Sequence, residues 1–159
     1  MDTLGSELLM PALSPKALWE TTNRTGIDVL LEARGANDAS RKRNDATYIL
    51  GCTHEEVVTR VAKKNRLSYK DFPFAVYQIQ TKFRNEERAK SGLMRGREFR
   101  MKDLYSFHRN EEELLAYYEQ VKQAYVRIFD RLGIGSDTKI AKASGGDFTT
   151  GFSHEFQTI

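Results

Sequence analysis

The sequence has little cysteine and lacks any long apolar run. Cys52 is the single cysteine among 159 residues, which excludes an internal disulfide and the secreted folds that depend on one. No apolar stretch reaches about 18 residues, so we expect no transmembrane helix and no membrane partner. Residues 1–15 begin acidic and contain two prolines, unlike a signal peptide, so a cytoplasmic protein is the default expectation.

Histidines and glycine-rich turns are also scarce. His54, His108 and His154 are dispersed without the spacing of metal ligands, so we predict no zinc site and assign no metal ligand. No glycine-rich phosphate turn follows a predicted strand, which makes a doubly wound sheet the less favoured fold. The net charge of +3 permits a nucleic-acid or nucleotide partner without arguing for one, because clustering of charge matters more than its sum.

The composition is that of an ordinary globular domain, with 40% hydrophobic and 30% charged residues. Short strands are predicted over residues 8–11 and 46–50. Two longer ones are predicted over 74–85 and 97–107, joined by a charged loop. Together with the helices predicted between them, they favour an α+β fold in which helices flank an antiparallel sheet.

Three helices are expected. Ser14 would cap the first, with Pro15 at its first helical position. Thr53 would cap the second, which runs from His54 to about Arg66 with two glutamates in its first turn. The third, over 110–132, is the clearest. Its apolar residues recur at helical spacing and should face a core: Leu114, Leu115, Tyr118, Val121, Tyr125 and Ile128.

Two segments lack a clear hydrophobic period. Residues 35–44 are polar and are predicted to form a loop. Residues 133–159 contain scattered glycines and short apolar runs, which is typical of a hairpin or a loop that leads to another strand. The chain has no internal repeat, and its length is that of one domain.

Arg84 and Glu86 are the first candidate ligand-binding residues. Two residues apart on a strand, they would point to the same face of the sheet. A guanidinium there can hold a phosphate or a carboxylate bidentately, and the glutamate can accept from an exocyclic amine such as that of adenine. The alternative is an exposed ion pair worth under about 1 kcal/mol, and the two residues alone favour that interpretation.

Arg95 and Phe99 change this weighting. A loop arginine can reach the outer phosphates of a nucleotide and a strand phenylalanine can stack on its base, although a solvated loop and a core ring are the simpler alternative. The spacing favours the ligand-binding interpretation over these alternatives. The sequence has Phe-Arg-x-Glu, then a loop of about eight residues, then Arg-x-x-x-Phe and Asp103. This combination resembles motif 2 of class II aminoacyl-tRNA synthetases.

Thr53 and Glu55 stand near a predicted helix N-terminus, where a cap and an acidic first turn would explain them without a function. A hydroxyl plus a carboxylate can also accept both N–H donors of a secondary ammonium such as proline. Beside the motif above, the segment Gly51–Val57 resembles the Thr-x-Glu loop of prolyl-tRNA synthetases. The similarity to the bacterial type of that family runs from about residue 6 to 159, including these segments: Leu9–Leu13, which is similar to the end of motif 1, Tyr77–Arg84, Gly92–Arg95, Met101–His108 and Ser153–Gln157.

The resemblance implies a fold, a set of roles and a set of partners. The fold would be an incomplete class II catalytic core over residues 1–159. Arg84 would be the catalytic residue, binding the α-phosphate of ATP and the carboxylate of L-proline. In the ATP half, Glu86 would bind the adenine amine, Arg95 the outer phosphate and Phe99 the adenine ring. In the proline half, Thr53 and Glu55 would bind the proline nitrogen, and His154 would lie near the proline ring. ATP and Mg²⁺ would be required, tRNA(Pro) would be the second substrate, and the full-length enzyme would be a homodimer.

The implied reaction is activation of proline as prolyl-adenylate, followed by transfer to tRNA. We recognise neither motif 3 nor an anticodon-binding domain, so we expect a fragment whose own aminoacylation is weak or absent. Cys52 departs from the proline that usually precedes this threonine in the bacterial family. Two alternatives stay open: a non-catalytic paralogue, although Arg84 and Glu55 are both present, and a class II enzyme for another amino acid such as threonine or serine. A structural protein is disfavoured by two ligand-binding motifs in one short chain.

Overall fold

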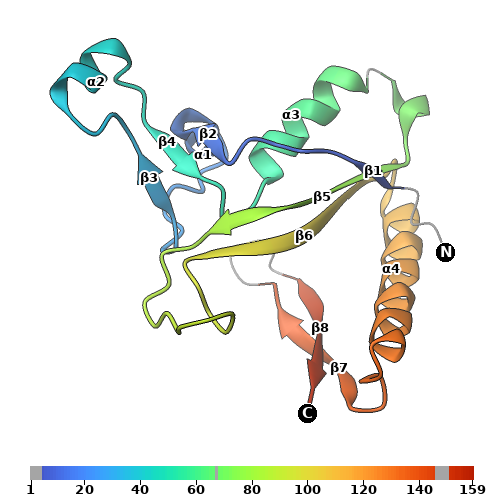
Figure 1. Cartoon of the computed structure of the whole chain (residues 1–159). Helices are drawn as coiled ribbons and strands as arrows, with labels where there is room; N and C mark the ends of the chain where they lie inside the picture. Colours follow the sequence, from blue (N-terminus) through green and yellow to red (C-terminus); the bar gives the residue numbers. More distant parts are fainter. Residues whose placement is uncertain (1–4, 67, 146–150) are drawn as a thin grey trace. The chain divides into compact units, whose positions relative to one another are not determined.

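The computed structural model describes residues 5–66, 68–145 and 151–159. The described residues form two compact units, a larger one that ends at Phe107 and a smaller one that begins at His108 (Figure 1). Among the helices of the described ranges, none combines the length and the apolar character that crossing a bilayer requires.

The larger unit is built on a three-stranded sheet in the order β1-β5-β6. The predicted long strands are confirmed: β5 (Phe74–Phe83) and β6 (Glu98–Phe107) form an antiparallel hairpin whose ends are in register. β1 (Gly5–Glu7) pairs with β5 in parallel, so this sheet is mixed rather than purely antiparallel as expected.

The strand predicted at Leu8–Pro11 is wrong in its position, because the strand ends before it. The backbone N–H of Leu8 still donates to the carbonyl of Tyr77 at 2.8 Å. The N–H of Met10 then donates to the side-chain Oε1 of Gln78 at 3.2 Å instead of to a strand carbonyl. This side-chain partner replaces the ladder and turns the segment away from β5.

A second, antiparallel sheet has the order β2-β4-β3. Its strands are β2 (Leu13–Pro15), β4 (Tyr48–Leu50) and β3 (Leu31–Ala33). β4 confirms the short strand predicted over residues 46–50. The residue after it, Gly51, accepts a backbone hydrogen bond from Phe83 at 3.1 Å, which joins this sheet to the end of β5.

The predicted cap of the first helix is wrong. α1 (Lys16–Thr21) follows Pro15 and has no side-chain cap. Ser14 instead lies in β2, where it is buried, and its Oγ accepts a hydrogen bond from Nε1 of Trp19 at 2.9 Å. Satisfying a buried indole N–H outweighs capping because the indole has no water to bond to.

A short helix stands where a loop was predicted. α2 (Asp38–Arg43) begins after Asn37, whose side chain accepts from the N–H of Ser40 at 3.0 Å. An acidic residue lies in its first turn and three basic residues lie in its last, which suits the helix dipole. α2 buries no residue, so no hydrophobic period marks it in the sequence.

The second predicted helix is confirmed as α3 (Glu55–Asn65), but its predicted cap is wrong. His54 occupies the N-cap position and makes no side-chain cap, while the hydroxyl of Thr53 bonds to the side chain of Glu55. A 3₁₀ turn, η1 (Tyr69–Asp71), follows α3 and precedes β5.

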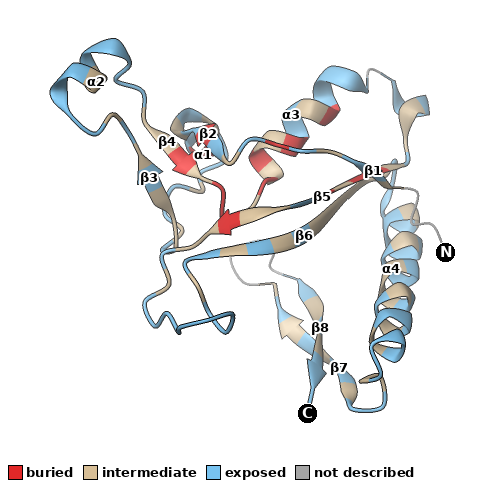
Figure 2. Ribbon diagram, in the orientation of Figure 1, coloured by how far each residue is buried: buried red, intermediate tan, exposed pale blue. Residues whose placement is uncertain are grey.

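The core of the larger unit has two clusters, both visible among the buried segments of Figure 2. One packs α3 against one face of the hairpin and contains Met10, Val58 and Val76. The other lies around the second sheet and contains Trp19, Ile49 and Cys52. The opposite face of β5 is more open, since Ile79 is exposed although the sequence predicted a largely buried strand.

The smaller unit pairs one helix with a hairpin. α4 (Glu111–Arg131) confirms the helix predicted over 110–132, with Asn110 accepting from the N–H of Glu113 at 2.9 Å. β7 (Thr138–Ser144) and β8 (Phe152–Thr158) form a hairpin, which is one of the two alternatives predicted for this segment.

The expectation that the apolar stripe of α4 faces a core is wrong for this chain. α4 has no buried residue, and Leu115 is 59% exposed. Within the smaller unit the helix packs on the hairpin, where the rings of Tyr125 and Phe129 stack on Phe156 with centroids 5.0 and 5.6 Å apart. A two-stranded hairpin is too narrow to cover a helix face of this width.

Candidate functional site

Thr53 and Glu55 lie side by side where β4 passes into α3. The hydroxyl of Thr53 hydrogen-bonds to Oε2 of Glu55, and the glutamate side chain remains 42% exposed. The two oxygen-bearing groups therefore form one small acceptor surface. Their role in binding an amine stays a prediction.

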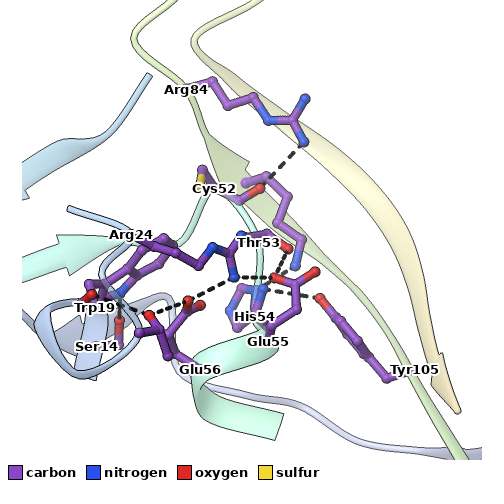
Figure 3. A network of polar contacts seen from close by, with 12 residues as sticks. Ser14, Trp19, Arg24, Cys52, Thr53, His54, Glu55, Glu56, Arg84 and Tyr105 are labelled. Carbon is purple, nitrogen blue, oxygen red and sulfur yellow. Dashed lines mark hydrogen bonds and ion pairs between the residues drawn. The ribbon is translucent and has the colours of Figure 1, made fainter. Parts of the chain in front are cut away.

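Arg24 stands behind this surface and was missed in the sequence. Its Nη1 donates to Oε1 of Glu56 at 2.7 Å and to Oε2 of Glu55 at 3.3 Å (Figure 3). Glu56 is 1% exposed at its side chain and also accepts from the hydroxyl of Thr22 at 3.1 Å. No sequence signal links the arginine to glutamates more than thirty positions away, because only the fold brings them together.

A row of buried polar side chains lies beneath the same loop. Lys82 and Gln78 are 0% exposed, although both belong to β5. The ammonium of Lys82 contacts Nδ1 of His54 and lies 2.9 Å from Oδ1 of Asp103. Gln78 donates to Oδ2 of the same aspartate at 3.1 Å. Gln78 and Lys82 are polar residues four positions apart on a strand predicted to be largely buried, and this is the sequence signal that could have revealed the row.

Tyr105 closes the row from β6. Its hydroxyl accepts from the backbone N–H of His54 at 3.0 Å. The ring of His54 is held on its other side, where Nε2 lies 3.0 Å from the carbonyl of Pro11. The loop that carries Thr53 is thus attached both to the hairpin and to the segment after β1.

Burial and charge set the protonation of this row. Burial, and then the Lys82 ammonium, lowers the pKa of His54. Burial alone would raise the pKa of Asp103, but hydrogen bonds from Tyr105, Lys82 and Gln78 hold it below its ordinary value. Burial, reinforced by the hydrogen bond to Asp103, raises the pKa of Tyr105, and burial lowers the pKa of Lys82 against the attraction of Asp103. His54 is therefore neutral, and Asp103 charged, at neutral pH.

Arg84 reaches the acceptor loop from the end of β5. Its Nη2 lies 3.5 Å from the carbonyl of Cys52, and its Cζ lies 5.4 Å from the centroid of the Phe99 ring. Gly51 is required at this junction, because a Cβ there would lie 2.8 Å from Cε1 of His54. The structure therefore brings Arg84, Phe99 and the acceptor loop together.

Glu86 and Arg95 pair with each other across the loop between β5 and β6. Nε of Arg95 lies 3.7 Å from Oε2 of Glu86, and the arginine side chain is 60% exposed. The prediction that Arg84 and Glu86 share a strand face is wrong, because β5 ends at Phe83 and the N–H of Glu86 folds back to the carbonyl of Arg84 at 2.8 Å. Their nucleotide contacts stay predictions.

His154 belongs to the smaller unit, whereas the other predicted site residues belong to the larger one. Nδ1 of His154 lies 3.0 Å from the hydroxyl of Tyr118, and the two rings meet at 5.8 Å. The histidine borders an aromatic groove of about 410 Å³ between α4 and β8. Its predicted contact with a proline ring stays a prediction.

The described residues offer no ready-made metal centre. Within residues 5–66, 68–145 and 151–159, no group of three or more histidine, cysteine, aspartate or glutamate side chains could hold an ion. Mg²⁺ commonly takes most of its oxygens from substrate phosphates and water.

Residues 37–158 match the family of the tRNA synthetase class II core domain (G, H, P, S and T). The chain belongs to this family, which confirms the class II resemblance and the α+β fold class. It is 44% identical to a proline–tRNA ligase from Burkholderia multivorans, over 96% of this chain and 25% of that protein. It is 46% identical to a proline–tRNA ligase from a Sulfurihydrogenibium species, over 98% of this chain and 27% of that protein. The expected likeness to prolyl enzymes is thereby confirmed.

A solved structure shares the fold. The crystal structure of prolyl-tRNA synthetase from Cryptosporidium parvum, complexed with L-proline and AMP, has a TM-score of 0.72 and 18% identity, covering 90% of this chain and 27% of that one. The chain spans about a quarter of the length of the curated relatives it matches.

Proposed function

We propose that this chain supplies the proline-activating part of a proline–tRNA ligase, as a partial catalytic domain over residues 1–159. The enzyme would form prolyl-adenylate from L-proline and ATP and transfer the prolyl group to tRNA(Pro). The observation that carries the proposal is the acceptor pair of Thr53 and Glu55, held within reach of Arg84 through the Cys52 carbonyl. The names of the relatives agree with this chemistry.

The acceptor pair suits a secondary ammonium. Oε2 of Glu55 receives Thr53 and Arg24, while its Oε1 has no partner among the residues that the structure describes. Oε1 and the lone pairs of the Thr53 hydroxyl can then accept the two N–H donors of the proline nitrogen. A charge-assisted pair of this kind is about twice as strong as a neutral one.

Arg84 would hold the proline carboxylate against the α-phosphate. The carboxylate oxygen attacks the α-phosphorus, and the bond from that phosphorus to the departing pyrophosphate breaks, so no protein nucleophile is needed. The contribution of Arg84 is positioning and stabilisation of phosphoryl charge. When bound, Mg²⁺ would neutralise further phosphate charge.

ATP binding would replace two contacts that the side chains of the free site make with each other. The Glu86–Arg95 pair is long and exposed, and such pairs are worth under about 1 kcal/mol. Its opening frees Glu86 for the adenine amine and Arg95 for the outer phosphate. The guanidinium of Arg84 rests on Phe99, and moving it to a phosphate would free that ring to stack on adenine.

The proposed reaction sets the wider context. We place it in the cytoplasm, where charged tRNA is used, and in a homodimer, because Leu9–Leu13 resembles the end of motif 1, whose proline faces the partner in this class. Neither placement rests on a contact within this chain.

The direct test is binding of non-hydrolysable aminoacyl-adenylate analogues, which needs no complete enzyme. Prolyl-, threonyl- and seryl-sulfamoyl-adenosine would be titrated into the chain by calorimetry, together with ATP–pyrophosphate exchange for the same amino acids. We expect the prolyl analogue to bind most tightly, and Glu55→Gln to weaken it by roughly tenfold or more. Preference for the threonyl or seryl analogue would refute the proposal. Tight analogue binding without any exchange would favour a binding paralogue or an incomplete enzyme.

A further inference from the structure

A buried contact between Lys82 and His54 joins the two halves of the proposed site. His54 lies between Thr53 and Glu55, which form the proline half. Lys82 lies two residues before Arg84, which begins the ATP half. The ammonium of Lys82 meets Nδ1 of the His54 ring, and both side chains are shielded from solvent. Neither residue reaches the surface where a ligand would bind.

The bonding partners fix the tautomer of the His54 ring. The Pro11 carbonyl can only accept, so Nε2 of the ring, 3.0 Å away, must carry the hydrogen. The ammonium of Lys82 can only donate, so Nδ1 must be the unprotonated acceptor. A protonated ring would point its Nδ1–H at the ammonium of Lys82, so two donors and two positive charges would meet with no acceptor between them. Burial and the Lys82 ammonium lower the pKa of His54, which agrees with a neutral ring at neutral pH.

The lysine is itself held in one place. Asp103 lies 2.9 Å from its ammonium, and the same carboxylate accepts from Gln78 at 3.1 Å. Tyr105 accepts from the backbone N–H of His54 at 3.0 Å, so the histidine is attached to the hairpin at its ring and at its backbone. These bonds lie in a region of low dielectric, where each is strong and expensive to break.

The contact matters because activation requires the two half-sites to be aligned. The proline carboxylate and the α-phosphorus must meet within about 3–3.5 Å, and a misplacement of about 1 Å can cost about 100-fold in rate. Besides the contact between Lys82 and His54, three other contacts join the two half-sites. They are the bond from the His54 N–H to the Tyr105 hydroxyl, the backbone bond from Phe83 to Gly51 and the long contact from Arg84 to Cys52.

We propose that Lys82 and His54 are positioning residues that set the distance between the proline half and the ATP half of the site. The inference rests on the proposed function and assigns these residues no contact with substrate. A ligand that spans both halves gains affinity from their fixed separation, whereas a ligand of one half does not. Loosening the contact should therefore weaken spanning ligands selectively.

The first experiment observes the contact itself, without any ligand. ¹⁵N NMR of the imidazole in the 159-residue chain should show a neutral ring with hydrogen on Nε2 that persists below the usual histidine titration range. Lys82→Met should change the Nδ1 resonance while the ring stays neutral. A ring that titrates near pH 6.5, or that carries its hydrogen on Nδ1, would overturn the proposal.

The second experiment separates positioning from general damage. The affinities of L-proline, ATP and prolyl-sulfamoyl-adenosine would be measured for His54→Leu, for His54→Gln and for Arg60→Gln, a control at an exposed position of α3. His54→Leu should weaken the spanning analogue by about tenfold or more while each single-half ligand changes by less than about threefold. His54→Gln keeps one donor and one acceptor on its amide and should restore most of the loss, and the control should change nothing.

The outcomes distinguish the two proposals. Equal losses for all three ligands, or an unchanged His54→Leu variant, would overturn the positioning role and leave the proposed function standing. A wild-type chain that binds none of the three would overturn the proposed function, and the positioning role would fall with it. If His54→Leu does not fold, Lys82→Met takes its place in the same comparison.

Discussion

Replacing Arg24 by methionine should destabilise the larger unit in a manner that depends on pH. The arginine is the cation that contacts the buried carboxylate of Glu56, at 2.7 Å. Methionine keeps an unbranched apolar stem and removes the guanidinium, with its hydrogen bonds and its position 5.5 Å from the centroid of the Trp19 ring. The hydroxyl of Thr22 stays with the carboxylate, and one neutral donor cannot replace a guanidinium.

The size of the effect has two bounds. Removing one partner of a buried ion pair costs about 3–5 kcal/mol, because it leaves an uncompensated buried charge. The carboxylate can avoid that cost by taking up a proton. One pKa unit is worth 1.36 kcal/mol, so neutralising a glutamate of ordinary pKa about 4.3 costs about 3.7 kcal/mol at pH 7 and about 1 kcal/mol at pH 5. We therefore expect a loss of about 3–4 kcal/mol at pH 7 that shrinks to about 1 kcal/mol at pH 5.

Urea unfolding followed by tryptophan fluorescence measures this loss of stability in the larger of the two structural units. Trp19 is the single tryptophan of the chain and is 1% exposed, so its emission reports on unfolding of the larger unit. Wild type and Arg24→Met would be unfolded at pH 7 and pH 5, and the free energies extrapolated linearly to water.

Two controls bracket the result. Arg60→Met, on the exposed side of α3, should change stability by less than about 0.5 kcal/mol. The double variant Arg24→Met with Glu56→Leu should recover most of the loss at pH 7, because an apolar pair can replace a buried ion pair. An equal loss at both pH values for Arg24→Met would refute the reasoning, since the cost would then come from packing rather than charge.

Three further predictions concern other features. Because the pKa of His54 is lowered in the fold, stability should fall as pH drops below about 6.5, by up to about 1.4 kcal/mol per pH unit, and His54→Gln should flatten this dependence in thermal or urea unfolding. Gly51→Ala should cost about 1–3 kcal/mol in urea unfolding, whereas Gly26→Ala, where a Cβ would meet nothing within 4 Å, should be nearly neutral. Asn37→Ala should lower the stability of α2 by about 1 kcal/mol, measured as faster amide exchange in that helix. Global stability should stay unchanged because α2 buries no residue, and a fall in it would contradict this prediction.

Patterns that are local in the sequence predicted the structure well. The hairpin of β5 and β6 and the helix α4 follow from side-chain period and from turn or cap residues, which neighbouring positions determine. The caps at Ser14 and Thr53 failed because each hydroxyl bonds to a nearby side chain instead of to a helix N–H, namely to Trp19 and to Glu55. A propensity is a weak preference, and one specific hydrogen bond outweighs it.

The candidate site also contains residues that the sequence predicted and residues that it did not. Arg84, Phe99 and the acceptor pair were found because their spacing repeats a known motif. Arg24 was not found, since its partners lie more than thirty positions along the chain and only the packing of α1 beside α3 brings them close. The parallel pairing of β1 was missed for a related reason: three residues carry too little pattern to reveal a partner seventy positions away.

The weak hold on Arg84 has a consequence for how the site would respond to substrate. Its backbone is fixed by a 2.9 Å hydrogen bond to Arg97. Among the residues that the structure describes, its guanidinium has only a 3.5 Å contact with the Cys52 carbonyl and the face of the Phe99 ring. The backbone of Arg84 is thus held in place, while its guanidinium can change rotamer easily. Substrate recognition in this unit should proceed by rotamer changes over an unchanged main chain, so a complex with the adenylate analogue should superpose on the free backbone and differ in χ angles.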